Sequence, residues 1–232
     1  MKKLILILSI FFAISISFAL CSCKEETIND APNQVIVCLG NSLTAGFGAT
    51  TPRVDDPTKS YPAFLQEKVN IPVINAGVSG NTSAMGLARV ASDVLSHDPQ
   101  IVIIELGAND LLQKILLPIT LENLQQIINL VNDGRRKVYL VKFYTEEMAR
   151  ALAITQGITD YDMQTFLIQQ YDNMFNMLAT SNNIELIEDI WSGIWDIHMS
   201  DPIHPNAQGY KLMANHYFKA LEPYLKENNF IK

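Results

Sequence analysis

The sequence has little cysteine, little basic charge and no periodic glycine or proline. Three cysteines in 232 residues are too few for a disulfide-stapled scaffold. Lysine and arginine number 17 against 24 aspartate and glutamate, and the resulting net charge of −7 argues against a sequence-independent nucleic-acid binder. The 11 glycines and 10 prolines follow no period, which excludes a collagen-like chain. The 48% of hydrophobic residues instead suit a globular domain with a sizeable core.

Several ligand-binding motifs are missing as well. No group of histidine, cysteine and carboxylate residues has the spacing of a zinc site, and no P-loop is present. Gly46-Phe47-Gly48 lacks the third glycine of a dinucleotide fingerprint. The residues therefore give no sign of a metal, nucleotide or dinucleotide site.

The first 23 residues have the layout of a bacterial export signal, with two lysines before an uncharged run over 4–20. The segment 20–23, LCSC, resembles a lipoprotein processing box, because Cys23 follows a small residue and has an aliphatic residue three positions before it. That resemblance implies cleavage before Cys23 and a diacylglyceryl group on it. The protein would then be an exported lipoprotein held on a bacterial membrane, at its periplasmic or cell-surface face. Ordinary secretion and an uncleaved anchor remain open.

Residues 24–33 are polar and contain a proline, which indicates a tether between the membrane and the folded part. No linker or repeat follows, so residues 34–232 are expected to form one domain. Within it, short apolar runs predict strands over Gln34–Leu39, Val73–Ala76, Ile101–Leu106, Val138–Phe143 and Ile184–Ile187. The longer intervals predict helices over Tyr61–Val69, Ser83–Ser96, Thr120–Asp133, Asp160–Ala179 and Asn206–Lys226.

Strands that are apolar throughout, with helices between them, indicate a parallel sheet covered on both faces. We therefore expect an α/β fold, a three-layer α/β/α sandwich with a parallel five-stranded sheet. In such sheets the functional site lies outside the carboxyl ends of the strands. Glycine-bearing polar loops follow the first three runs there, and a fourth polar segment precedes the last helix: Gly40–Thr44, Asn75–Asn81, Gly107–Asp110 and Asp201–Pro205.

The fourth segment favours nucleophilic catalysis. A serine becomes a nucleophile when an imidazole takes its proton and a carboxylate orients the imidazole. His204 has Asp201 three residues before it, so we assign His204 as the base and Asp201 as its partner. His198 is the rival base, with Asp196 and Asp201 nearby. Without a histidine beside it, Asp201 could equally be a turn or helix N-terminal carboxylate.

Three donors for an oxyanion stand on three of these loops. Gly80 can present an unobstructed backbone N–H, Asn109 an amide N–H, and Ser42 its own backbone N–H. Each has an ordinary structural alternative, because Gly80 also suits a turn and Asn109-Asp110 a helix cap. Their placement on one sheet edge favours an oxyanion hole.

These four blocks resemble the SGNH (GDSL-type) hydrolase family. The blocks are Gly40–Thr44, Gly80, Gly107–Asp110 and Asp201–His204, they occur in family order, and they span most of the mature domain. The stretches NAGVSGNTSAMGLARV and VIIELGAND are most similar to the branch of multifunctional acyl-thioesterase, lysophospholipase and arylesterase proteins.

The resemblance implies the fold of that family, a catalytic triad of Ser42, Asp201 and His204, an oxyanion hole of Ser42, Gly80 and Asn109, and no metal or organic cofactor. It implies a serine ester hydrolase whose partner is a small-molecule ester, such as a lysophospholipid, an aryl ester or a short-chain ester. One position departs from the pattern: Asn41 stands where family members usually carry aspartate. We expect this departure to bear on the stability of the nucleophile loop and on the pH optimum, and the reaction mechanism to survive it.

Three other functions remain open from the sequence. A carbohydrate esterase that removes acetyl groups would use the same chemistry on another acyl donor. A surface lipoprotein that binds glycan or lipid without turnover suits the export signal and negative charge equally well. An α/β-hydrolase shares the chain order Ser, Asp, His, although Gly40–Thr44 lacks the second glycine of its nucleophile elbow.

Overall fold

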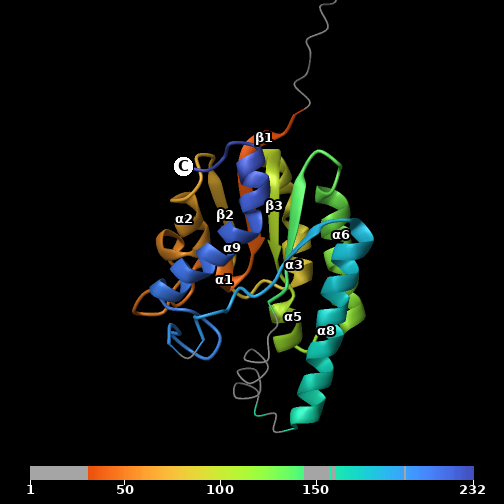
Figure 1. The fold of residues 1–232 in the computed structure, drawn as a ribbon. Helices are drawn as coiled ribbons and strands as arrows, with labels where there is room; N and C mark the ends of the chain where they lie inside the picture. The colour runs from red at the N-terminus through yellow and green to blue at the C-terminus, as the bar shows by residue number, and fades with distance from the viewer. Residues whose placement is uncertain (1–30, 144–156, 158–159, 196) are drawn as a thin grey trace, which may run out of the picture. The chain divides into compact units, whose positions relative to one another are not determined.

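The computed structural model describes residues 31–143, 157, 160–195 and 197–232. Cys23 and most of the predicted tether lie outside the described residues. Residues 31–232 form one compact unit. Figure 1 shows a central sheet with helices packed against both of its faces.

Five parallel strands form the sheet in the order β2-β1-β3-β4-β5. Their bounds are β1 (Asn33–Gly40), β2 (Val73–Gly77), β3 (Pro99–Glu105), β4 (Lys137–Val141) and β5 (Glu185–Ile187). Each lies within two residues of its predicted bounds. Gly40 pairs with Gly77 on one side and with Glu105 on the other, so β1, β2 and β3 end level.

The helices complete two outer layers. On one face α2 (Tyr61–Gln66) packs against α9 (Ala207–Glu227), and on the other α3 (Ser83–Ala88) packs against α6 (Leu117–Val131) beside α8 (Tyr161–Asn182) (Figure 1). Shorter helices are α1 (Ser42–Ala45), α4 (Val90–Asp93) and α5 (Ala108–Leu112), with 3₁₀ turns η1 (Pro57–Lys59) and η2 (Leu95–His97). The predicted three-layer α/β/α sandwich with a parallel five-stranded sheet is confirmed.

The core follows the apolar pattern of the sequence. The central strands β1 and β3 bury Ile36–Leu39 and Ile101–Ile104 completely, because helices cover both of their faces. Helix α6 turns an apolar face inward at a spacing of three and four residues, through Leu124, Ile127, Ile128 and Val131. Three of the four predicted site segments follow β1, β2 and β3 at one edge of this sheet, and the loop before α9 brings the fourth to that edge.

Two helices are shorter than predicted. The expected helix over 83–96 is broken into α3 and α4 at Arg89, whose backbone leaves the helical region with φ −113° and ψ 7°. The Arg89 guanidinium donates instead to the carbonyl oxygens of Gly40 and Ala76 at the strand ends. The expected helix over 61–69 ends at Gln66, whose amide donates to the carbonyl oxygens beyond the helix.

Candidate active site

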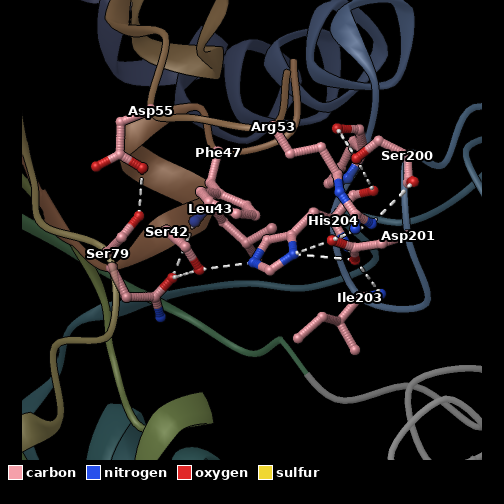
Figure 2. A network of polar contacts seen from close by, with 12 residues as sticks. Ser42, Leu43, Phe47, Arg53, Asp55, Ser79, Ser200, Asp201, Ile203 and His204 are labelled. Carbon is pink, nitrogen blue, oxygen red and sulfur yellow. Dashed lines mark hydrogen bonds and ion pairs between the residues drawn. The ribbon is translucent and has the colours of Figure 1, made fainter. Parts of the chain in front are cut away.

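Ser42 occupies the first position of α1, directly after β1. Asn41 caps this helix, because its Oδ1 accepts the Leu43 N–H at 3.0 Å. The Ser42 N–H lies at the free end of the helix and has no acceptor within the described residues. The Ser42 hydroxyl points toward the segment before α9 (Figure 2). The nucleophile predicted from the sequence thus stands at the carboxyl edge of the sheet with its oxygen accessible to an imidazole.

That imidazole belongs to His204, whose Nε2 lies 2.9 Å from Ser42 Oγ. The other ring nitrogen, Nδ1, lies 2.9 Å from Asp201 Oδ2 and 3.0 Å from Oδ1 (Figure 2). Phe47, just after α1, packs its ring 4.7 Å from the imidazole ring. The structure therefore brings together three residues that are separated by up to 162 positions in the chain.

The local turn holds Asp201 in its charged form. Its Oδ1 accepts the backbone N–H groups of Ile203 and His204, each at 2.9 Å. Burial raises the pKa of Asp201, but these hydrogen bonds and the imidazole outweigh burial and keep the pKa below its usual value. An ionised carboxylate only accepts hydrogen bonds, so Nδ1 of His204 carries the hydrogen and Nε2 accepts the Ser42 O–H.

The rival base predicted from the sequence occupies a different place. His198 contributes its backbone: its N–H donates to Ile194 and its carbonyl oxygen accepts from Asn206. These bonds shape the loop before α9 and hold the turn that carries His204. Among the described residues, His204 is the histidine hydrogen-bonded to Ser42.

The predicted oxyanion donors lie on neighbouring turns. Gly80 has φ +81°, the left-handed conformation that favours glycine, and the space that a Cβ would occupy is open. Its N–H has no acceptor within the described part of the chain. The Asn109 amide donates to the Asn81 carbonyl oxygen at 2.9 Å, which holds α5 against the Gly80 turn. A second Nδ2 hydrogen of Asn109 remains for a ligand.

Asp110 supports this arrangement, because its side chain accepts hydrogen bonds from neighbouring helices. Helix α5 begins at Ala108, and its N-cap residue Gly107 provides no side-chain hydrogen bond. The fully buried Asp110 carboxylate instead accepts the Ser83 N–H at 2.7 Å and the Thr120 hydroxyl at 3.2 Å. It thereby links α5 to α3 and α6 and fixes the helix that carries Asn109.

Three charged residues at the site were missed by sequence reasoning. Arg89 ties the loops together, because its guanidinium donates to Gly40 O at 2.7 Å and to Asn81 Oδ1 at 2.8 Å. Figure 2 shows Arg53 beside Asp201, with Nη1 3.5 Å from Oδ2, and Asp55 hydrogen-bonded to Ser79. The segment between α1 and η1 thus contacts both sides of the site. No sequence signal marks these residues, since each acts through a long-range contact.

The described residues contain neither a metal-binding cluster nor a membrane-spanning helix. No three of their histidine, cysteine and acidic side chains gather closely enough to hold a metal ion. None of their helices combines the length and hydropathy that crossing a bilayer requires.

Known proteins resemble this chain in sequence and in fold. Residues 38–212, from β1 into α9, match the model of the GDSL-like lipase/acylhydrolase family. The chain belongs to this family. Lipases and acylhydrolases cleave carboxylic esters, and this GDSL-type chain is accordingly a carboxylic ester hydrolase. The family resemblance predicted from the sequence is confirmed.

Three relatives illustrate the likeness of this hydrolase to known proteins. It is 32% identical to an arylesterase of Vibrio mimicus over 115 residues, which are 47% of this chain and 54% of that protein. It is 26% identical to thioesterase 1/protease 1/lysophospholipase L1 of Escherichia coli (strain K12) over 208 residues, covering 88% of this chain and 90% of the relative. The crystal structure of psychrotrophic esterase EstA from Pseudoalteromonas sp. superposes with a TM-score of 0.67 at 21% identity, covering 84% of this chain and 100% of that one. This last likeness concerns the fold.

Proposed function

We propose that the protein hydrolyses carboxylic esters through an acyl-enzyme on Ser42, with His204 as general base and Asp201 as the residue that orients it. The observation that carries this proposal is the 2.9 Å contact between Ser42 Oγ and His204 Nε2, with the Asp201 carboxylate on the opposite ring nitrogen. A hydroxyl, an imidazole and a carboxylate in this order form the arrangement that activates serine.

The first step forms the acyl-enzyme. His204 Nε2 takes the hydroxyl proton as Ser42 Oγ attacks the carbonyl carbon of the ester, and Asp201 stabilises the imidazolium. The carbonyl oxygen becomes an oxyanion that the N–H groups of Ser42 and Gly80 and the Asn109 amide stabilise. When the tetrahedral intermediate collapses, the carbon–oxygen bond of the leaving group breaks, and the alcohol takes the proton from Nε2.

The second step releases the acid. A water molecule gives its proton to His204 Nε2 and attacks the acyl carbon, which restores the oxyanion on the same donors. The bond to Ser42 Oγ then breaks, and the serine recovers its proton from the imidazole. The overall reaction consumes one ester and one water and needs only residues of this chain.

As substrates we propose acyl or aryl esters, such as lysophospholipids or short-chain esters. The names of the relatives support these classes, since one is an arylesterase and another a thioesterase and lysophospholipase. A series of p-nitrophenyl esters of increasing chain length, compared with release of fatty acid from lysophospholipid and of acetate from acetylated glycan, would define the substrate. Predominant acetate release would favour the carbohydrate esterase.

The assignment of the nucleophile is tested by Ser42→Ala. We expect this variant to lose nearly all p-nitrophenyl ester hydrolysis and all labelling by a fluorophosphonate probe. Ser92→Ala is the matched control, because Ser92 is an exposed serine on α4 whose side chain contacts only its own helix. Hydrolysis by Ser42→Ala at the wild-type rate would refute the assignment. Failure of the folded wild type to react with the probe would favour the non-catalytic binding protein.

We further propose that residues 1–23 are an export signal that ends in a lipidated Cys23, that 24–33 form a tether, and that 34–232 form the hydrolase domain. The processing box supports lipidation, and β1 begins at Asn33, close to the proposed end of the tether. Metabolic labelling with an alkyne fatty acid tests this. Cys23→Ser should abolish incorporation and membrane association, whereas Cys21→Ser should retain both; labelling that persists in Cys23→Ser would contradict the proposal.

A further inference from the structure

The helix that carries Ser42 is too short to hold its own orientation. Helix α1 has four residues, a single turn, and forming one turn is unfavourable without outside contacts. Glu105, the last residue of β3, lies against this turn and is fully buried. It takes no part in the reaction steps derived above.

The Glu105 carboxyl contacts both ends of the turn. Its Oε1 accepts from Asn41 Nδ2 at 3.0 Å, immediately before Ser42. Its Oε2 accepts the Thr44 hydroxyl, also at 3.0 Å, two residues after Ser42. The nucleophile therefore lies between two residues that are bound to one carboxyl group.

This contact also decides which way the Asn41 amide faces. Because Nδ2 donates to Glu105, Oδ1 faces the other way, toward the Leu43 N–H at 3.0 Å and Ser42 Oγ at 3.5 Å. The cap of α1 and a polar contact of the nucleophile thus depend on the acceptor at position 105. An aspartate at position 41 would set two carboxyls against each other, whereas asparagine donates to Glu105.

The backbone is fitted closely around this carboxyl. Gly40 pairs with Glu105 across the sheet, and a Cβ at Gly40 would lie 1.9 Å from Thr44 Oγ1 and 3.0 Å from Glu105 Oε2. The absence of a side chain at Gly40 lets β1 approach the carboxyl and its hydrogen-bonded hydroxyl. The carboxyl is therefore part of a packed unit with the nucleophile turn.

Keeping this carboxyl buried is unfavourable. Burial raises the pKa of Glu105 to about 7, although the hydrogen bonds from Thr44 and Asn41 lower it. No cation pairs with it in the described part of the chain, and the titratable groups that face it are Tyr61 from α2 and Tyr210 and Tyr217 from α9. Buried acids with perturbed pKa values concentrate at functional sites.

We propose that Glu105 is a positioning residue for the nucleophile: by holding Asn41 and Thr44 it keeps Ser42 Oγ directed at His204. This inference rests on the proposed function of Ser42 and extends it to the residue behind the nucleophile turn. The carboxyl makes no contact with substrate in this role, so its removal lowers kcat and leaves substrate binding nearly unchanged.

The principal test is Glu105→Met, which retains bulk and removes both acceptors. We expect kcat for a p-nitrophenyl ester to fall about 10²-fold, because a small displacement of a reacting group has an effect of that size. KM should stay within about twofold, and the rate at which a fluorophosphonate labels Ser42 should fall in parallel with kcat. Val131→Ala is the control for loss of stability. Val131 is a buried core residue at the last position of α6. Its truncation should lower the melting temperature without lowering kcat.

A second pair of variants decides the matter where Glu105→Met does not fold. Thr44→Val removes one of the two donors at nearly constant volume and should lower kcat about tenfold, equivalent to one hydrogen bond to a charged group. Thr44→Ser keeps the hydroxyl and should restore most of kcat. A purely structural role for Thr44 would not follow the hydroxyl in this way.

The outcomes separate this inference from the proposed function. If folded Glu105→Met or Thr44→Val keeps kcat within about threefold of an active wild type, or if Thr44→Ser is as slow as Thr44→Val, the positioning role is overturned and the catalytic role of Ser42 stands. If the wild type neither hydrolyses esters nor reacts with the probe, the proposed function fails.

Discussion

Two carboxyl groups flank the nucleophile turn in opposite surroundings. In front of Ser42, Asp201 lies in a loop turn beside the imidazole, and backbone N–H groups keep its pKa low. Behind Ser42, Glu105 ends a central strand, and burial raises its pKa to about 7. A carboxyl held as an anion suits the chemistry proposed in front of Ser42, whereas a carboxyl held among hydroxyl and amide donors suits the shaping of a turn.

The largest loss of kcat is expected when the proposed base beside Asp201 is removed, and a neighbouring histidine serves as the control. His204→Ala should lower kcat on the order of 10⁶-fold, because the proposed base is lost while the fold remains. His198→Ala is the matched control and should keep kcat within about threefold, since His198 shapes the loop through its backbone. The rate of ester hydrolysis at saturating substrate gives kcat for both variants. A larger loss of kcat in His198→Ala than in His204→Ala would make His198 the base and contradict the role proposed for Asp201 and His204.

The second-largest loss of kcat is expected for Asn109→Ala, which removes one of the proposed oxyanion donors. We expect kcat to fall by about 10²–10³, the effect of losing one oxyanion donor. Asn129→Ala, on an exposed position of α6, should leave kcat unchanged and serves as the control. A loss below about threefold in Asn109→Ala would reduce the residue to the support that its bond to Asn81 provides.

The two carboxyls should have opposite effects on stability as pH changes. The folded pKa of Glu105 lies above that of an unfolded glutamate, so the folded state binds the proton more tightly, and this contribution is lost as pH rises from 4.5 through about 7. As pH rises between these values, the unfolding free energy of Glu105→Gln should therefore increase by about 2–3 kcal/mol relative to that of the wild type. Tyr61, Tyr210 and Tyr217, which face Glu105, remain neutral over this range.

Asp201→Asn provides the contrast, when denaturant titrations at a series of pH values measure the unfolding free energy of wild type, Glu105→Gln and Asp201→Asn. The folded pKa of Asp201 is depressed, so its contribution is present above an unfolded pKa of 3.8 and is lost as pH falls through the folded value. The variant should therefore lose stability relative to wild type at neutral pH and approach it in acid. Parallel pH profiles for the two variants would contradict the proposed difference between front and back.

The smallest expected effect concerns Arg53. Its guanidinium lies 3.5 Å from Asp201, but 54% of its side chain is exposed, and exposed ion pairs contribute little. Arg53→Gln should change kcat/KM by less than about threefold, and about 1 M salt should remove the difference by screening. Comparison of kcat/KM at low and high salt checks this; a large loss that salt does not affect would make Arg53 part of the catalytic front.

The front of the site could be predicted because its pattern is local. Asp201 and His204 stand three residues apart, and the apolar runs predict strands whose carboxyl ends bring Ser42, Gly80 and Asn109 to one edge. The role of Glu105 behind Ser42 could not be predicted, because its contacts depend on the sheet register that sets it opposite Gly40 and on the packing of Thr44. Within β3, Glu105 looks like a polar interruption at the end of a buried strand.

Arg89 shows the same limit in the helices. The apolar spacing over 83–96 predicts one continuous helix, and the structure has a break at Arg89. At this break the Arg89 guanidinium donates hydrogen bonds to the carbonyl oxygens of Gly40 and Ala76, which lie on two different strands. No periodicity within the segment reveals these contacts. Local patterns therefore predict the elements, and long-range hydrogen bonds decide how they are interrupted near the site.

The distance along the chain between Ser42 and His204 has a consequence for synthesis. The ribosome adds His204 162 residues after Ser42. The segment that carries His204 precedes α9, and Tyr210 of α9 anchors it by donating a hydrogen bond to the Phe47 carbonyl oxygen. Until that segment has reached Ser42, the growing polypeptide carries a serine hydroxyl without its proposed base. The proposed catalytic arrangement can therefore form only after synthesis has passed His204 and the loop before α9 has reached Ser42.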